Sequence, residues 1–332
     1  MSNKKRDVYS LSLSGRINLN LHDLNNEETE GNQQITRFVT IVNREGTPYT
    51  VNAISGDMFK HILCAHFQKL ALDGDLPLCA GCFKFDANRI CIDKDFIGKI
   101  GDDKKGGKTK DQGKLTDLLI QMCSLDDLAG NLITSGGMNL ARKSIAEFGW
   151  VAALPENYTT DSKFHVKFAQ EPGEGAEKGA NIGQNIFYRP LNSGVYATVT
   201  NLEVYRLGLN DITRKYAIDD IERLNRYKTL LLALMATYTS PEGAQTNTQK
   251  PHITGFEGVI TASISPISSP MPSPLFDPID DGYISELERI VKNFNDMGRL
   301  VELHKFSNLA EFTDIIKDFH ENTSPFKQKE AK

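Results

Sequence analysis

The residues best suited to chemistry in this sequence are two cysteines separated by two residues. Cys79 and Cys82 have the spacing that places two thiolates on one tetrahedral ion. A zinc site needs two more ligands, and the sequence has no second pair of this kind. Cys123, at the end of a predicted helix, and His66, on the helix before the pair, could supply them. The sequence therefore predicts either a structural zinc site of these four residues or two half-buried free thiols.

Patterns that could support catalysis are weak. The segment 101–109 (GDDKKGGKT) resembles a phosphate-binding nucleotide loop, but five residues rather than four separate Gly101 from Gly107. It is expected to be a charged loop. Asp126 and Asp127 are adjacent, so their side chains point in different directions in either a helix or a strand. No nucleophile, histidine and carboxylate are suitably spaced. We expect no catalytic residues and no cofactor required for function.

A helix start near Ser55 offers a site for an anion. Residues 55–57 (SGD) precede apolar residues at helical spacing, which continue to Gly74. The free N–H groups of the first turn, with Lys60 just inside, could bind a chain phosphate. A plain capped helix, with Ser55 as the cap, is the simpler interpretation of the same residues.

The composition is that of an ordinary globular protein, with 39% hydrophobic and 24% charged residues among 332. A net charge of −5 argues against a generally basic nucleic-acid binder, although a local groove can still bind phosphates. Five cysteines do not suggest a disulfide framework. With no signal peptide and no apolar run long enough to span a bilayer, we expect a cytoplasmic protein with no membrane partner.

The elements that must position these residues alternate between strands and helices, which predicts an α+β sheet with helices on one face. Residues 22–34 are expected to be a surface loop, and 164–191 a long hairpin with a polar tip. The strand expected at 148–154 would bury Trp150. Further strands are expected at 8–21, 38–42, 49–53, 195–209 and 259–264, and helices after Ser55 and at 115–122, 219–238, 284–295 and 309–319.

The helix expected at 219–238 is strongly amphipathic. Its pattern predicts that Ile221 faces inward and that Arg223 and Arg226 face outward.

Several long stretches, in order along the chain, resemble one family. They include SLSGRINLNLHDLNNEETEGNQQITRFVTIV, YTVNAISGDMFKHI, CSLDDLAGNLIT, ARKSIAEFGW, GQNIFYRPLNSGVYA, YRLGLNDI and PEGAQTNTQKPH. The chain resembles the DevR-family Cascade backbone subunits of type I CRISPR surveillance complexes, closest to the type I-B branch. The resemblance runs from about residue 8 to 264 and continues more loosely to the end.

The resemblance implies a modified RNA-recognition-motif (ferredoxin-like) palm formed by residues 1–75, 143–163 and 192–332. Residues 76–142 would be the finger insertion and 164–191 the thumb hairpin. In such complexes, copies of the subunit stack along the guide crRNA, and the bases left exposed between thumbs pair with the target DNA strand. The implied partners are therefore crRNA, target DNA, further copies of the chain, and the large, guide-5′-end and guide-processing Cascade subunits of a prokaryotic cytoplasm.

The resemblance also implies which side chains contact the guide. Arg189 is the strongest candidate, because a guanidinium can grip phosphate through two hydrogen bonds, and Phe187 or Tyr188 could stack on a base. Each candidate could instead be a solvated or capping side chain. The full set is Arg16, Asn32, Arg37, Ser55, Gly56, Lys60, Lys143, Gln184, Asn185, Phe187, Arg189, Ser193 and Asn247.

Two departures from related modules matter. The stacking aromatics of an ordinary RNA-recognition motif are absent from the central strands, so loops and thumb should bind the RNA. Thr246 stands where relatives often carry a basic residue, so no phosphate contact is expected there. Related type III subunits cut RNA with a first-loop aspartate, but the acids here (Asp23, Glu27, Glu28 and Glu30) lack a matching context. A metal-dependent ribonuclease and an RNA-binding autoregulator remain the alternatives to a non-catalytic backbone subunit.

Overall fold

The computed structural model describes residues 6–101, 107–134, 138–167, 185–276 and 282–329. The strands are β1 (Arg6–Val8), β2 (Ser10–His22), β3 (Asn26–Glu30), β4 (Gln33–Thr36), β5 (Phe38–Val42), β6 (Pro48–Ile54), β7 (Asn131–Ile133), β8 (Leu140–Arg142), β9 (Ala146–Phe148), β10 (Val151–Lys167), β11 (Asn185–Leu202), β12 (His252–Ser263), β13 (Val301–Phe306) and β14 (Thr323–Pro325). The helices are α1 (Gly56–Asp73), α2 (Ala80–Phe83), α3 (Lys94–Ile97), α4 (Gln112–Met122), α5 (Ser124–Ala129), α6 (Asp220–Thr239), α7 (Gly282–Asp296) and α8 (Leu309–Asn322).

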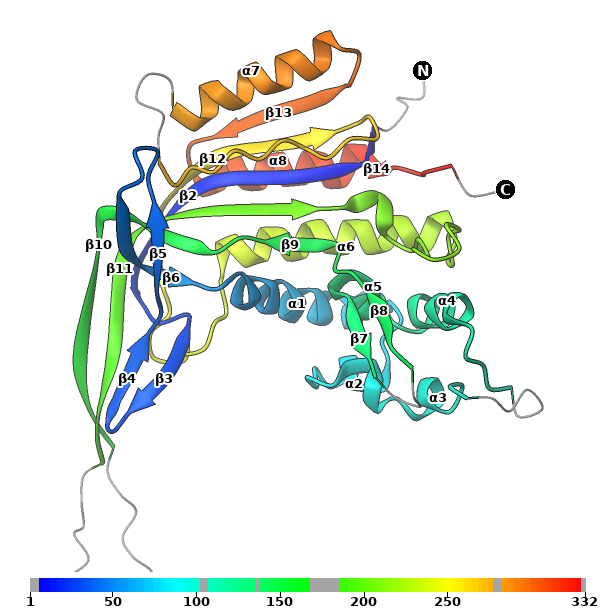
Figure 1. The fold of residues 1–332 in the computed structure, drawn as a ribbon, viewed down its shortest axis with the longest axis horizontal. Coiled ribbons are helices and arrows are strands. Elements are labelled where there is room, and N and C mark those ends of the chain that lie inside the picture. Colours follow the sequence, from blue (N-terminus) through cyan, green and yellow to red (C-terminus); the bar gives the residue numbers. More distant parts are fainter. Residues whose placement is uncertain (1–5, 102–106, 135–137, 168–184, 277–281, 330–332) are drawn as a thin grey trace, which may run out of the picture.

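The main sheet has the strand order β13-β12-β2-β11-β10-β6-β5 (Figure 1). β2 lies in its middle and runs antiparallel to both β11 and β12. Leu11, Leu13, Ile17 and Leu19 alternate along β2 and are fully buried, as period-two spacing predicts. The predicted α+β class is therefore confirmed.

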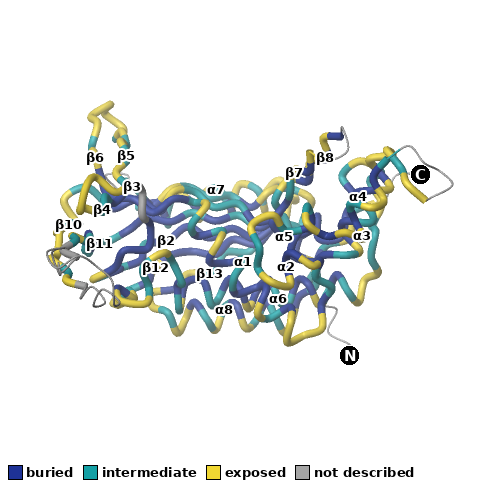
Figure 2. The backbone as a smooth tube through the Cα atoms, turned by 90° about the horizontal axis from the view of Figure 1, so that it is seen from below, coloured by how far each residue is buried: buried dark blue, intermediate teal, exposed yellow. Residues whose placement is uncertain are grey.

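The core lies between this sheet and the helices α1, α6 and α8. Tyr238 of α6 stacks on Phe256 of β12 at 5.0 Å between ring centroids, and Phe312 of α8 packs edge-on against both rings. Phe59 of α1 contacts Tyr238 from the other side. Figure 2 shows the buried residues running through the middle of the molecule, while the ends of β5 and β6 are exposed.

Two segments project from the sheet at opposite ends (Figure 1). β10 and β11 pair as far as Lys167 and Asn185, so the stem of the predicted hairpin is present, and its tip lies outside the described residues. Helices α2 to α5 and strands β7 and β8 form the insertion at the other end. Residues 102–106 of the lysine-rich loop also lie outside the described part of the chain.

Two predictions about local structure were wrong, and one strand was missed. Residues 22–34 are not a surface loop, because His22 to Asn25 are buried and the rest contributes the hairpin β3–β4. Trp150 is 47% exposed, since the chain between β9 and β10 carries it out of the core. The strand β13 was not predicted at all.

The orientation predicted for α6 was also wrong. Arg223 and Arg226 are buried, whereas Ile221 is 73% exposed. The buried carboxylate of Asp127 on α5 explains why Arg226 is buried. It pairs with the guanidinium of Arg226 at 2.9 Å and with that of Arg142. This buried ion cluster joins the insertion to α6.

Candidate nucleic-acid interface

Three segments far apart in the sequence meet at the base of the β10–β11 hairpin. We call residues 21–25, 188–193 and 243–249 the hairpin-base junction. The backbone N–H of Leu21 donates to Ser193 Oγ at 3.0 Å, and Gln249 Nε2 donates to the carbonyl of Pro190 at 2.6 Å. The N–H of Gln245 donates to the carbonyl of Asp23 at 3.2 Å. The junction therefore brings Ser193 and the loop that carries Asn247 beside the end of β2.

Arg189 lies on the half-exposed side of this junction. Its Nη1 donates to Thr248 Oγ1 at 2.9 Å, and its guanidinium carbon lies 4.9 Å from the centroid of the Phe187 ring. The other side of the hairpin contributes His165, whose ring stacks on Phe187 at 5.6 Å. Tyr188 is 41% exposed. The strand thus presents one positioned cation and adjacent aromatic surface, which are the groups that hold single-stranded RNA.

Ser55 caps α1, as its simpler interpretation predicted. Its Oγ accepts from the N–H of Met58 at 3.2 Å and donates to Asn25 Oδ1 at 3.0 Å. Asn25 belongs to the hairpin-base junction, so the helix start and the junction are joined by a hydrogen bond. Close packing explains the glycine at position 56, because a Cβ there would overlap the carbonyl oxygen of Phe148.

Lys60 lies one turn further along α1 and lines a cavity of about 340 Å³. His61 and Arg89 line the same cavity, with Asp57 and Asp86 on its wall. The cavity therefore places the cationic side chains of Lys60 and Arg89 near the start of α1.

The structure does not bring the remaining candidates together. Arg16 donates through Nε and Nη2 to the carbonyl of Pro274, at 3.1 and 2.9 Å, which ties the proline-rich segment to β2. Arg37 lies over the ring of Trp150 at 5.5 Å. Lys143 pairs with Glu147 at 2.6 Å and with Glu203 at 3.3 Å.

Two further candidates lie near the hairpin. The carbonyl of Asn32, between β3 and β4, accepts from the N–H of Tyr188 at 2.9 Å. Asn247 is exposed in the junction loop. Asn185 begins β11, and Gln184 lies outside the described residues.

The junction also holds buried polar atoms without a hydrogen-bond partner among the described residues. They are His22 Nε2, both carboxylate oxygens of Asp23, Asn25 Nδ2 and Gln249 Oε1. Burial raises the pKa of Asp23 to about 7 and lowers the pKa of His22 to about 3. Unpaired buried groups are rare in native proteins, so their concentration here sets the junction apart from the rest of the fold. Nothing in the polar sequence of 22–34 signalled this burial.

The predicted metal set is brought together in part. Cys79, Cys82 and Cys123 lie together, with Asp126 rather than His66 as the fourth group. His66 was wrongly included, because its Nε2 lies 3.0 Å from the carbonyl oxygen of Ser240 on the other side of α1. Asp126 and Asp127 do diverge as predicted, and the divergence points Asp126 at the thiols.

Comparison with known proteins identifies the family. A profile of the CRISPR-associated negative auto-regulator DevR/Csa2 matches residues 13–287. The chain belongs to the DevR/Csa2 family. This confirms the resemblance drawn from the sequence motifs.

The chain is also similar to one curated protein and to chains of two solved structures. The chain is 28% identical over 272 residues to the CRISPR-associated protein Cas7/Csa2 1 of Saccharolobus solfataricus, a match that covers 78% of this chain and 81% of the relative. A chain of a "CRISPR RNA-guided surveillance complex, pre-nicking" is similar with a TM-score of 0.48 and 11% identity, over 96% of each chain. A chain of a "CRISPR RNA-guided surveillance complex" has a TM-score of 0.46 and 12% identity, over 94% of this chain and 98% of that one. Within the described residues, no helix is both long and apolar enough to cross a membrane.

Proposed function

We propose that this DevR/Csa2-family chain is a non-catalytic backbone subunit that binds crRNA, oligomerises along it and presents it for pairing with target DNA. Its partners would then be crRNA, the target strand, further copies of itself and the other Cascade subunits. In this arrangement residues 1–75, 143–163 and 192–332 serve as a palm related to RNA-recognition motifs, with fingers at 76–142 and a thumb at 164–191.

The observation that carries the proposal is the convergence at the hairpin-base junction. Arg189, Ser193 and the loop around Asn247 meet beside the start of α1, although they are far apart in the sequence. A guide backbone needs donors at fixed positions rather than a high net charge. An acidic chain with one positioned guanidinium and nearby aromatic surface meets that need.

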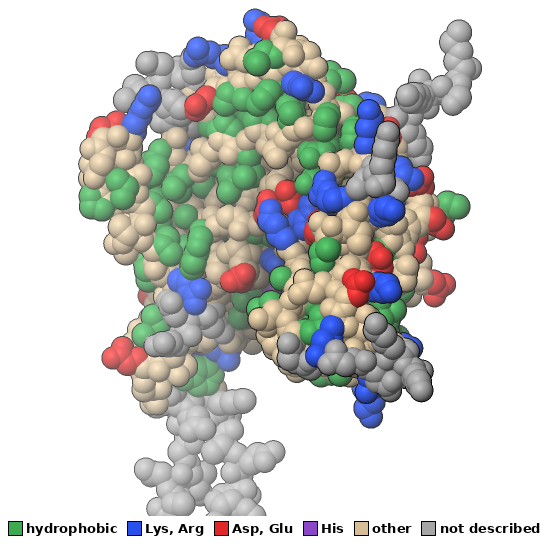
Figure 3. Space-filling view, turned by 45° about the vertical axis from the view of Figure 1, so that its right-hand side comes forward, with side chains coloured by type: hydrophobic (Ala, Val, Ile, Leu, Met, Phe, Trp, Pro, Cys, Tyr) green, Lys and Arg blue, Asp and Glu red, His purple; other side chains and the backbone are tan. Residues whose placement is uncertain are grey.

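An apolar surface supports stacking of copies. A shallow hollow of about 260 Å³ is lined by Val39, Ile41, Trp150, Val199 and Leu275. On the face shown in Figure 3, hydrophobic side chains are concentrated in the left half, whereas many Lys and Arg lie on the right among Asp and Glu. Exposed apolar patches of this kind mark contacts with other proteins.

The junction makes Arg189 the most informative residue to change. We expect Arg189→Ala to weaken binding to crRNA roughly tenfold to a hundredfold, since a hydrogen bond from a charged group contributes about 1.5–3 kcal/mol. Arg189→Lys should cause an intermediate loss of affinity, because lysine keeps the positive charge but cannot donate the two parallel hydrogen bonds of a guanidinium. Lys143→Ala is the matched control, because Glu147 and Glu203 already neutralise this exposed cation. The measurement is fluorescence anisotropy with labelled guide RNA. Equal losses for Arg189→Ala and Lys143→Ala would contradict the assignment.

One observation bears on the ribonuclease alternative. Asp23 is one of the first-loop acids. Both of its carboxylate oxygens are buried and have no hydrogen-bond partner among the described residues. A metal-dependent nuclease needs further ligands beside it. Among the described residues, the group that could hold a metal ion is the cysteine cluster. Our proposal predicts that assembled complex leaves labelled target RNA intact in Mg²⁺. Periodic cleavage that Asp23→Asn abolishes would replace our proposal with the nuclease.

The RNA that co-purifies with the protein distinguishes the backbone role from the autoregulator alternative. Co-expression with a CRISPR array should yield protein that purifies with RNA of one defined length. Protein that purifies without RNA, or with RNA of random length, would speak against a backbone role.

A further inference from the structure

Three thiols and a carboxylate converge inside the insertion, at the opposite end of the sheet from the β10–β11 hairpin. We propose that Cys79, Cys82, Cys123 and Asp126 bind one zinc ion with a structural role. This inference stands apart from the proposed RNA-binding function.

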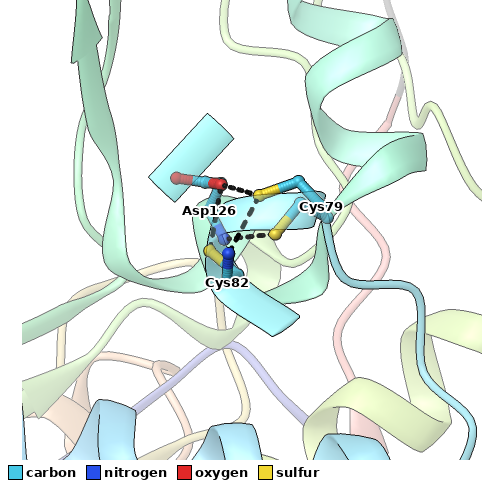
Figure 4. A group of neighbouring side chains, drawn as sticks. Cys79, Cys82 and Asp126 are labelled. Atoms are coloured by element: carbon cyan, nitrogen blue, oxygen red, sulfur yellow. Dashed lines mark hydrogen bonds between the residues drawn. The ribbon is translucent and has the colours of Figure 1, made fainter. Parts of the chain in front are cut away.

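The four ligand atoms lie close enough together to surround one ion. They all lie within 4.8 Å of one another. Asp126 Oδ2 is 3.4 Å from Cys79 Sγ and 3.3 Å from Cys82 Sγ (Figure 4). Zinc bonds of ordinary length place a sulfur and an oxygen ligand about 3.5 Å apart. The ion would therefore enter with little movement of the side chains.

The surroundings orient the carboxylate toward the sulfurs. Asn131 Nδ2 donates to Asp126 Oδ1 at 2.7 Å, and Arg89 Nη1 lies 3.6 Å from the same oxygen. These contacts hold Oδ1 and leave Oδ2 facing the sulfurs of Cys79 and Cys82. Partners behind a ligand of this kind fix its orientation in metal sites.

Two of the three sulfurs also accept hydrogen bonds from backbone N–H groups. The N–H of Cys82 donates to Cys79 Sγ at 3.4 Å, and the N–H of Asp126 donates to Cys123 Sγ at 3.3 Å. Gly81 allows this tight turn, because a Cβ there would overlap the carbonyl of Arg89.

Burial and ligand type select a structural zinc. All four residues are buried, with exposures of 2% for Cys79 and 0% for Cys82 and Cys123, so no position is left open for a substrate. Thiolates favour zinc over magnesium or calcium. An ion here would cross-link the turn at 79–82 to the start of α5 at 123–126, two parts of an insertion built from short helices and strands. The cavity lined by Cys82 and Arg89 provides the access path.

The experiment is metal analysis of the full chain by inductively coupled plasma mass spectrometry, after expression in zinc-supplemented medium. We expect one zinc per chain in the wild type and a loss of most of it in Cys82→Ser. Cys64→Ser is the matched control, because Cys64 lines the same cavity but lies outside the cluster. Asp126→Cys should keep one zinc, since it converts the site to four thiolates.

A second measurement uses the wild-type chain and does not depend on the folding of a cysteine variant. Cobalt-substituted wild type should show the visible absorption of a tetrahedral cobalt–thiolate site. Asn131→Ala should lower zinc affinity roughly tenfold to a hundredfold in competition with a chromogenic chelator. Wild type with less than about a tenth of a zinc per chain, a different stoichiometric metal, or equal zinc loss in Cys64→Ser and Cys82→Ser would overturn the proposal.

Discussion

Asp23 is a carboxylic acid with no exposed surface and no hydrogen-bond partner in the described part of the chain. Burial raises its pKa to about 7, and the charge of Arg189 offsets part of that rise. The unfolded chain releases this proton near pH 4. The folded state therefore binds more protons between these values, and this group's contribution to stability declines as pH rises from about 4 to 7.

Replacing Asp23 with its uncharged isostere should remove the cost of holding a charged carboxylate in the interior. We expect Asp23→Asn to raise the free energy of unfolding by about 2–3 kcal/mol more at pH 8 than at pH 5. Urea denaturation of the RNA-free protein at both pH values measures this. Asp161→Asn is a control, because the pKa of that exposed acid is lowered by its hydrogen bond with Lys163. If Asp23→Asn raised the free energy of unfolding equally at both pH values, ionisation of a buried Asp23 would not be the cause.

At the scale of elements, a buried ion cluster joins α5 to α6 and β8. Asp127 has no exposed surface and accepts from Arg142, from Arg226 and from the N–H of Gly208 at 3.0 Å. Without Asp127, Arg142 and Arg226 keep only the partly exposed carboxylates of Asp211 and Glu222 as ionic partners. Part of the buried positive charge then loses its compensation.

We therefore expect Asp127→Asn to lower the free energy of unfolding by about 3–5 kcal/mol. Asp220→Asn, on the same helix as Arg226 but 64% exposed in its pair with Lys327, should cost less than about 1 kcal/mol. Chemical denaturation followed by circular dichroism distinguishes the two. A small effect at Asp127 would mean that the insertion is held to α6 by other contacts.

The same elements show what sequence patterns could and could not predict. The period-two run of β2 and the capped start of α1 depend on neighbouring residues, and both were predicted. Arg226 was placed outward because an arginine is usually solvated. Its burial depends on Asp127, 99 residues away, and no local pattern contains that pairing.

The candidate site divides in the same way. Arg189 and Ser55 were identified through family resemblance and local capping rules, whereas the contacts that gather them cross long stretches of chain. Asp126 was set aside because it adjoins Asp127 in sequence, yet that divergence is what points it at Cys79 and Cys82.

For the whole molecule, net charge and exposed apolar surface have opposite effects. Each chain carries a formal charge of −5, so copies brought side by side repel one another unless something screens them. The hollow around Trp150 favours association through apolar contact. A polyanionic guide does not neutralise this charge. Under the proposed function, it would hold copies together through local contacts such as the one proposed for Arg189.

Salt should therefore change two measurements in opposite directions. Raising sodium chloride from about 50 to about 500 mM should increase self-association of the RNA-free chain, because screening shortens the range of repulsion between copies. The same change should weaken guide binding, with a logarithmic slope of about −0.7 for each phosphate contacted. Sedimentation velocity measures the first and anisotropy the second. Arg189→Gln should make the binding slope shallower by about 0.7 per bound copy and leave RNA-free association unchanged. If salt dispersed the RNA-free chain, ionic contacts rather than the apolar face would hold copies together.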